Sequence, residues 1–352
     1  MNWRRRAGRA LAQAMVLAMV LAMVLAVVLA SAWGALALWF QLPAAAAVIL
    51  GGAWCLLGLA VALTLARARP GKPGKFGRRG HAVLLAGALA AVAMIGWWSS
   101  LAPSHDRVWA DDVARLLEAR VDGDRLELRN VRNFEWRTET DYTPRWETRH
   151  YDLSKLESAD LILSYWMGPH IAHTLVSFGF SDGQRLVLSL EIRKERGEAF
   201  SALGGFFRKF EQVIVAADER DLIRTRSNAR GEQVYLYRLR ARPAQLRAVL
   251  LDYLARAERL RAQPEFYNTL TSNCTTILFE LARHIDPALP VDYRLLASGH
   301  FAEYAYDQDG LTPGLPYEVL RARGHINERA RQSDLDGSDF SQAIRAGVPG
   351  VR

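Results

Sequence analysis

Three long apolar runs near the N-terminus constrain the fold of this 352-residue chain more than any other feature. They extend over about residues 11–40, 44–66 and 81–99, and none of them contains a charged side chain. A helix of about 20 apolar residues is long enough to cross the hydrocarbon core of a bilayer. We therefore expect residues 1–100 to form a membrane anchor with three transmembrane helices, followed by a second domain over residues 101–327.

A cleavable signal peptide is the alternative interpretation of the first run, because Arg4, Arg5 and Arg6 precede it. The run is longer than the apolar core of an ordinary signal peptide, and two further apolar runs follow it closely. The sequence therefore favours a retained transmembrane helix.

Basic residues are concentrated on one side of the expected helices. Arg4, Arg5, Arg6 and Arg9 precede the first run, and the connection between the second and third runs holds Arg67, Arg69, Lys72, Lys75, Arg78 and Arg79. Because basic loops stay in the cytoplasm, the N-terminus is expected there and the second domain in the periplasm of a bacterium, anchored in the inner membrane. The net charge of +8 depends on these residues, so it does not indicate a nucleic-acid partner.

The part of the chain after Ser100 contains both strand-like and helix-like segments. Asp182-Gly183 separates two apolar, strand-like runs, which is a strong hairpin signal. Strands are expected at residues 126–128, 159–166, 171–180, 185–193, 213–216 and 234–239, and helices at 107–122, 243–262 and 274–284. This mixture predicts an α+β domain with an antiparallel sheet and flanking helices. Residues 328–352 are rich in Ser, Asp, Gly and Arg, which predicts a loose C-terminal tail.

The chain has two cysteines, and only Cys274 lies in the second domain. Cys55 lies within the second apolar run, so a disulfide between the two is not expected. Ser272 or Asn273 is a good N-cap, which would place Cys274 in the first turn of a helix. The helix dipole there favours a thiolate, and the backbone N–H groups could hold an oxyanion. Cys274 is therefore a candidate nucleophile, with a buried structural cysteine as the alternative.

A nucleophilic thiol needs a base, and His173 is the best placed of the candidates. It opens the first strand of the hairpin and lies across from Glu191 or Ile192, so Glu191 could orient the imidazole as the third member of a triad. The alternative for His173 is a strand histidine that is hydrogen-bonded to backbone groups. The alternative for Glu191 is a carboxylate that faces solvent. His170 and His173 do not form a convincing metal pair, and no cofactor or metal is expected. The other histidines of the domain are His105, His150, His170, His284, His300 and His325.

Several short motifs occur in an order that is found in a known family. They are Tyr151–Ser154, Ala172–Phe180, Ser189–Arg193, Gly204–Arg208, Asp218–Asp221, Phe266–Asn268 and Asn273–Thr276. This series, over roughly residues 125–290, resembles the bacterial family of exported domains named after the N-terminal periplasmic domain of a lipoprotein N-acyltransferase. The order of a histidine on a strand, a polar residue on the next strand and a cysteine at a helix start is also similar to circularly permuted papain-like enzymes, such as lecithin–retinol acyltransferase.

The resemblance implies a domain of permuted papain-like type with Cys274 as nucleophile, His173 as base and Glu191 as the orienting residue. It also implies a two-step acyl transfer, in which a membrane phospholipid gives an acyl chain to the thiol and an amine, such as the N-terminus of a lipoprotein, then accepts it. Asn273 and Tyr267 belong to the matching motifs and are candidate substrate-binding residues.

Two other functions remain open from the sequence. The same cysteine and histidine would serve a cell-wall peptidase or amidase with water as the acceptor, and a membrane-tethered binding module would need neither.

Two further segments could either bind a ligand or have only a structural role. Residues 130–146 could line a polar and aromatic groove or pack as a surface loop, and Arg220, Arg224 and Arg226 could contact phosphate or pair with nearby acids. The oligomeric state is not predicted.

Overall fold

The computed structural model describes residues 2–67 and 76–351, which form two compact units. The anchor unit comprises residues 1–103 and Phe207–Lys209, and the sheet unit comprises residues 104–206 and 210–352. Of the predicted basic connection, Arg69, Lys72 and Lys75 lie outside the described residues.

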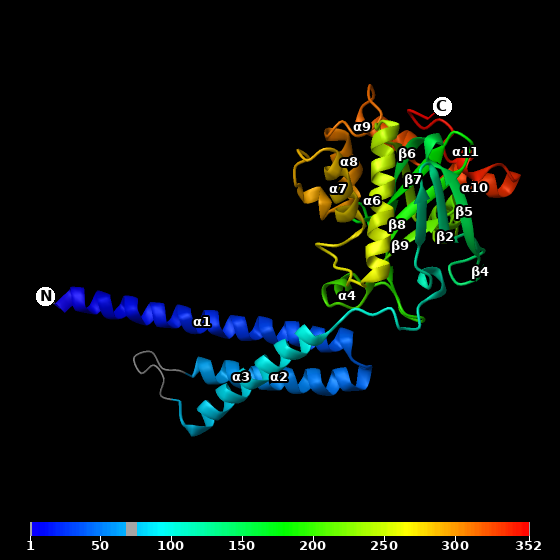
Figure 1. Ribbon diagram of the computed structural model, residues 1–352. Helices are drawn as coiled ribbons and strands as arrows, with labels where there is room; N and C mark the ends of the chain where they lie inside the picture. Colours follow the sequence, from blue (N-terminus) through cyan, green and yellow to red (C-terminus); the bar gives the residue numbers. More distant parts are fainter. Residues whose placement is uncertain (1, 68–75, 352) are drawn as a thin grey trace. The chain divides into compact units, whose positions relative to one another are not determined.

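The anchor unit is built on three long helices, labelled α1 to α3 in Figure 1. They are α1 (Asn2–Gln41), α2 (Ala44–Ala66) and α3 (Arg78–Ser100). All three are long and apolar enough to cross a membrane, and the span within α1 is Leu11–Gln41. Most of their side chains are exposed, as lipid-facing residues would be. The predicted anchor of three apolar helices is therefore confirmed.

Aromatic side chains gather at the C-terminal ends of α1 and α3. The ring centroids of Trp33 and Trp98 are 5.1 Å apart, and Phe40 stacks on Phe207 of the same unit at 5.6 Å. Gln41 Nε2 donates a hydrogen bond of 2.6 Å to the Phe207 carbonyl. Because tryptophan is enriched where a membrane meets water, this end of the anchor has the composition of an interfacial belt.

The sheet unit contains an eight-stranded sheet with the order β1-β2-β9-β8-β7-β6-β10, and β5 pairs with β2. All its strand pairs are antiparallel except β2 with β9. Its strands are β1 (Glu118–Asp122), β2 (Arg125–Arg132), β5 (Trp146–Asp152), β6 (Leu156–Tyr165), β7 (Ala172–Phe180), β8 (Arg185–Arg193), β9 (Glu211–Ala217) and β10 (Gln233–Arg238). A second, two-stranded sheet joins β3 (Glu135–Trp136) to β4 (Tyr142–Thr143). The predicted α+β architecture is confirmed, whereas its permuted papain-like type stays a prediction.

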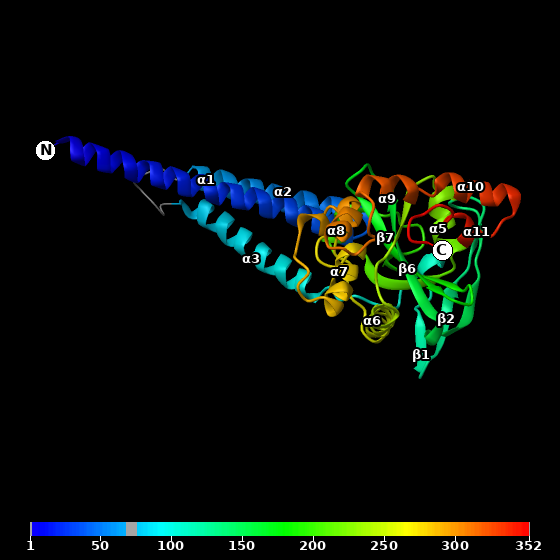
Figure 2. The same ribbon diagram turned by 90° about the horizontal axis from the view of Figure 1, so that it is seen from above.

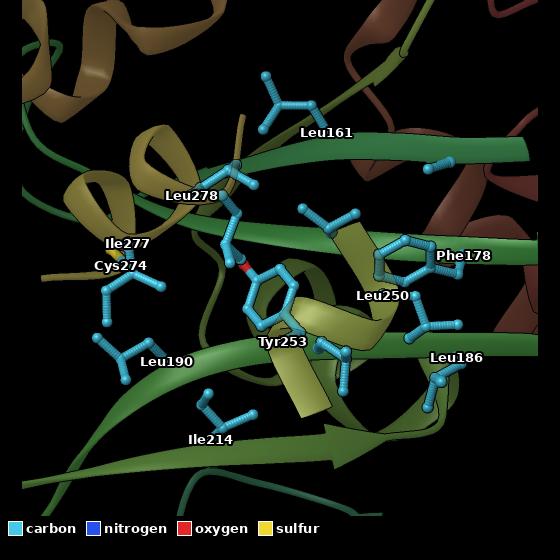
Figure 3. Packing of buried hydrophobic residues seen from close by; sticks show 14 of the residues in the cluster. Leu161, Phe178, Leu186, Leu190, Ile214, Leu250, Tyr253, Cys274, Ile277 and Leu278 are labelled. Atoms are coloured by element: carbon cyan, nitrogen blue, oxygen red, sulfur yellow. The ribbon is translucent and has the colours of Figure 1, made fainter. Parts of the chain in front are cut away.

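Helices cover both faces of the sheet, because the strands bury side chains alternately on either side. On one face, Tyr253 and Leu278 pack against strand residues such as Phe178 and Leu190 (Figure 3). They belong to α6 (Pro243–Ala262) and α7 (Cys274–Ile285). Figure 2 shows α5 (Glu219–Arg224), α10 (Asn327–Asp336) and α11 (Phe340–Ala343) on the opposite face. The remaining short helices are α4 (Ala202–Phe206), α8 (Phe301–Asp307) and α9 (Tyr317–Gly324).

The helix predicted over residues 107–122 is wrong. The segment forms a single 3₁₀ turn, Asp111–Val113, and then strand β1, which pairs with β2 across a tight turn. Val113 and Leu117 are buried in the two different cores, and Val108 is 66 % exposed, so no common helical face exists. Tertiary strand pairing therefore overrides the local helical periodicity.

The loose tail predicted for residues 328–352 is also wrong. This segment forms most of α10 and all of α11, and Ala330, Phe340 and Ile344 are buried in the core of the second face. Arg345 is buried and pairs with Asp160 and Glu219. Sparse apolar residues and one buried ion pair therefore order a segment whose composition is polar.

Candidate active site

Cys274 is the first residue of helix α7, and Asn273 is the N-cap. The side-chain oxygen of Asn273 accepts hydrogen bonds of 2.9 Å from the N–H groups of Thr275 and Thr276. Its amide nitrogen donates to the Thr269 carbonyl at 2.8 Å. This cap fixes the first turn of α7 and places the thiol at the positive end of the helix, where a thiolate is favoured.

His173 lies where strands β7 and β8 separate. Their ladder runs from Gly179 opposite Arg185 only as far as Val176 opposite Leu188, although both strands continue beyond it. The thiol reaches this gap, where it is hydrogen-bonded to the side chain of His173 and to the backbone of Thr174. The splayed hairpin therefore admits the N-terminus of α7 between two strands.

Strand β8 holds the imidazole of His173 on the side that faces away from the Cys274 thiol. Its Nε2 lies 2.7 Å from Ser189 Oγ and 3.0 Å from Glu191 Oε1. Ser189 Oγ also donates to the same carboxylate oxygen at 2.9 Å. With Nε2 occupied in this way, Nδ1 is the ring nitrogen that is left to face the thiol. Cys274, His173 and Glu191 are therefore brought together in the order that a triad requires.

A buried arginine supports Glu191 from behind. Arg226 Nη2 donates to Glu191 at 3.1 Å, and Nη1 donates to Glu232 at 3.3 Å. Ser164 donates a further hydrogen bond to Glu232. Glu191 thus accepts hydrogen bonds from His173, Ser189 and Arg226, which explains how its charge is tolerated in the interior.

These contacts shift the pKa values of the three groups. Burial alone would raise the pKa of the Cys274 thiol, but the charge and hydrogen bond of His173 bring it below its usual value. Burial would lower the pKa of His173, but the negative charge of Glu191, together with the charge and hydrogen bond of Cys274, raises it to about 9. The pKa of Glu191 is held well below its usual range, against burial, by His173 and Arg226. These contacts therefore favour the thiolate of Cys274 and the imidazolium of His173 over the neutral pair.

A cavity of about 710 Å³ opens onto Cys274 and His173. Its wall is mixed, with the ionic groups around Glu191 at one part and apolar or aromatic side chains at another. The apolar residues include Tyr165, Trp166, Met167, Ile171, Leu190, Ile192, Phe200, Leu222 and Leu296. A site of this size and character suits a ligand with a long apolar part and a polar reacting group.

The two candidate substrate-binding residues, Tyr267 and Asn273, both line the cavity. The pKa of Tyr267 is raised by burial and by the charges of Cys274 and Glu191, so its phenol stays protonated beside the thiolate. A Cβ at Gly205 would lie 3.2 Å from the Tyr267 ring and overlap the Thr269 hydroxyl, so α4 approaches this side chain closely because residue 205 is glycine. The side chain of Asn273 is already engaged by the cap.

The other six histidines have partners outside the cavity wall. His105 contacts Arg193 and Arg261, His150 pairs with Glu127, His170 contacts His300, His284 pairs with Asp252, and His325 contacts Gln233. Within residues 2–67 and 76–351, no cluster of three or more His, Cys, Asp or Glu side chains is arranged to hold a metal ion.

Of the two alternatives for residues 130–146, a polar and aromatic groove or a packed surface loop, the structure favours packing of the aromatic residues, although Arg132 and Glu139 line the cavity. Trp136 is buried and donates its indole N–H to Asp221 at 2.8 Å, and it packs with Phe134 and Tyr142. Arg224 pairs with Asp334, and Arg226 is engaged by the two glutamates of the site. The aromatic residues therefore stabilise the fold, and these two arginines are paired with carboxylates.

The geometry defines a class of protein: an α+β domain with a buried cysteine, histidine and glutamate site, in a chain with three membrane-spanning helices. Residues 142–299 match the family described as the Lnb N-terminal periplasmic domain, and this segment includes all three site residues. The match confirms the resemblance found in the sequence, and together with the three apolar helices it supports a membrane-anchored periplasmic domain. No curated protein and no solved structure matches the chain.

Proposed function

We propose that the protein is a membrane-anchored cysteine acyltransferase that takes an acyl chain from a phospholipid and passes it to an amine. The observation that carries this proposal is the hydrogen-bonded pair of Cys274 and His173, backed by Glu191, in the wall of a partly apolar cavity. The amine that we propose is the N-terminus of a lipoprotein, and the membrane is the bacterial inner membrane with the sheet unit on its periplasmic side.

In the first step, the Cys274 thiolate attacks the carbonyl carbon of the ester. The oxyanion that forms can be held by the N–H of Cys274, since the next two N–H groups of α7 are bound to Asn273. The C–O bond then breaks, and the His173 imidazolium gives its proton to the leaving alkoxide. The products are a lysophospholipid and a thioester on Cys274, with His173 neutral.

In the second step, neutral His173 accepts a proton from the incoming amine as its nitrogen attacks the thioester carbonyl. The C–S bond breaks, the amide is released, and the thiolate and imidazolium are restored. Glu191 keeps the imidazole in place in both steps and stabilises its positive form, as the acidic member of a triad does.

Mass spectrometry of the full-length protein in phospholipid vesicles tests this proposal. We expect the Cys55→Ala protein to gain the mass of one acyl chain in a hydroxylamine-labile form, and the Cys55→Ala, Cys274→Ser protein to gain none. Transfer of the acyl chain to an added amine peptide supports a transferase, whereas its release as free fatty acid supports a hydrolase. The absence of any adduct would overturn the acyl-enzyme mechanism.

A further inference from the structure

Six large apolar side chains in or next to the cavity wall remain exposed. Four of them line the cavity, and Leu203 and Leu270 directly follow the lining residues Ala202 and Thr269. The exposed fractions of the six lie between 41 % for Trp166 and 58 % for Leu203. We call this set the apolar rim; it consists of Trp166, Met167, Phe200, Leu203, Leu270 and Leu296. Scattered apolar residues are normal on a protein surface, but a group beside one cavity is typical of a surface that binds protein or lipid.

The rim is continuous because the segments that carry it are joined to one another. The rings of Trp166 and Phe200 meet edge to face with centroids 4.9 Å apart. Thr269 Oγ1, next to Leu270, donates to the carbonyl of Ala202 in α4 at 2.8 Å. Ser298, two residues after Leu296, accepts a hydrogen bond of 3.0 Å from the N–H at the start of β7. Four segments of the sheet unit therefore present apolar residues in or beside the cavity wall.

The chain itself indicates what this rim meets. α4, which carries Leu203, is followed directly by Phe207 of the anchor unit. Phe207 stacks on Phe40, and the Arg208 guanidinium lies 4.7 Å over the Trp98 ring. Both aromatic partners lie at the C-terminal ends of membrane-spanning helices. Leu203 is thus four residues from a segment that packs on the interfacial end of the anchor.

We propose that the apolar rim inserts into the interfacial layer of the bilayer that holds the anchor, so that a phospholipid acyl chain reaches the cavity without crossing water. Trp, Phe, Met and Leu are the residue types that enter this layer, where apolar faces sink roughly 5–10 Å into the boundary between headgroups and chains. This inference extends the proposed function, and the delivery of an acyl chain to the cavity rests on that function. The insertion itself does not require catalysis.

Fluorescence quenching by nitroxide lipids tests the insertion in the full-length protein. A Cys55→Ala, Cys274→Ser background removes both native thiols and all acyl transfer. Leu203→Cys or Leu270→Cys, neither of which lines the cavity, then receives an environment-sensitive dye. The matched control is Leu335→Cys on α10, a residue that is 81 % exposed on a helix with no residue in the cavity wall. The vesicles contain phosphatidylethanolamine, phosphatidylglycerol and a phospholipid with a nitroxide high on its acyl chain.

We expect the dyes at positions 203 and 270 to be quenched several times more strongly than the dye at position 335. Equal, weak quenching at all three positions would overturn the insertion. Because the background is inactive, this result is independent of the acyl-enzyme experiment: quenching at the rim without any acyl-enzyme in the active protein would reject the proposed function and leave the membrane contact standing.

Discussion

Burial opposes both charges of the Cys274–His173 pair, and it is offset by Glu191 and by the attraction between the two groups themselves. Glu191 is the nearest negative charge to the imidazole, and Arg226 keeps that carboxylate ionised. The thiol gains its low pKa indirectly, because Glu191 stabilises the imidazolium that in turn stabilises the thiolate. At the scale of residues, the reactivity of Cys274 therefore depends on a charge that does not touch it.

Glu191→Gln tests this chain of effects. The substitution removes the charge that raises the pKa of His173, so burial prevails and we expect that pKa to fall from about 9 to below the usual histidine value. An NMR titration of ¹³C-labelled histidine measures the shift, with His173→Gln identifying the signal. Ser189→Ala is the control, because it removes a hydroxyl near the same nitrogen but no charge. An unchanged titration of His173 in the Glu191→Gln protein would contradict the account.

The sequence predicts part of this arrangement and leaves the rest open. The Asp182-Gly183 turn sets the register of the hairpin, so the pairing of His173 with the region of Glu191 follows from the spacing. Ser189 could have been predicted as a further contact of the His173 imidazole, since it lies two residues before Glu191 on the same face of the strand. Arg226 and Glu232 could not have been placed, because they follow α5 in an irregular π-helical turn and a loop whose partners are set only by the tertiary fold.

At the scale of elements, the longest segments with clear boundary signals were predicted correctly, whereas three shorter elements were not. Helices α6 and α7 begin at the expected residues, Pro243 and Cys274, because proline and an Asn cap mark their first turns. The strand β1 and the helices α10 and α11 also have local signals, namely the turn residue Gly123, the left-handed Gly337 and the Asp339 cap, but these signals do not decide the structure of such short segments. Their structures depend on pairing and ion contacts with residues far away in the sequence.

Arg345→Ala tests how the C-terminal segment is held. The substitution leaves Glu219 and Asp160 buried without this cation, and loss of one partner of a buried ion pair costs about 3–5 kcal/mol in the free energy of unfolding. Thermal unfolding of the sheet unit in the full-length protein measures the change. The control Arg331→Ala, at an exposed position, should cost less than about 0.5 kcal/mol.

The cost of Arg345→Ala should also depend on pH. Arg345 depresses the pKa of Glu219 in the folded protein, against the effect of burial. This stabilisation is present above the unfolded pKa of the carboxyl and is lost as the pH falls through the depressed folded pKa. The difference between the variant and the native protein should therefore shrink in acid. Equal stability of the two proteins at neutral pH would show that the ion pair does not hold the segment.

At the scale of the whole molecule, three apolar helices precede a domain whose proposed reaction needs a lipid and an amine on the same side of the membrane. The basic residues before α1 and between α2 and α3 favour the orientation that meets this need. The three helices follow from composition alone, which is why the sequence predicts them well, whereas their orientation stays a prediction. The ligands that bind in the cavity cannot be inferred from the amino-acid composition.

Labelling with a membrane-impermeant maleimide tests the orientation. In the Cys55→Ala, Cys274→Ser background, we expect Leu335→Cys to be labelled in cells whose outer membrane alone is permeable, because the sheet unit would face the periplasm. Gly8→Cys, before the first span, should be labelled only after lysis. The reverse pattern would contradict the proposed topology.

The most direct test of the central claim is the alkylation rate of Cys274 by iodoacetamide as a function of pH, in the full-length Cys55→Ala protein with and without His173→Gln. With His173 present, we predict that the rate rises at a pH below the value of about 8.5 for an ordinary thiol. Without the imidazolium, burial outweighs the remaining hydrogen bond to the Thr174 backbone, and the rise should move above that value. Coincident profiles for the two proteins would mean that His173 does not activate Cys274, and the acyl-transfer mechanism would lose its nucleophile.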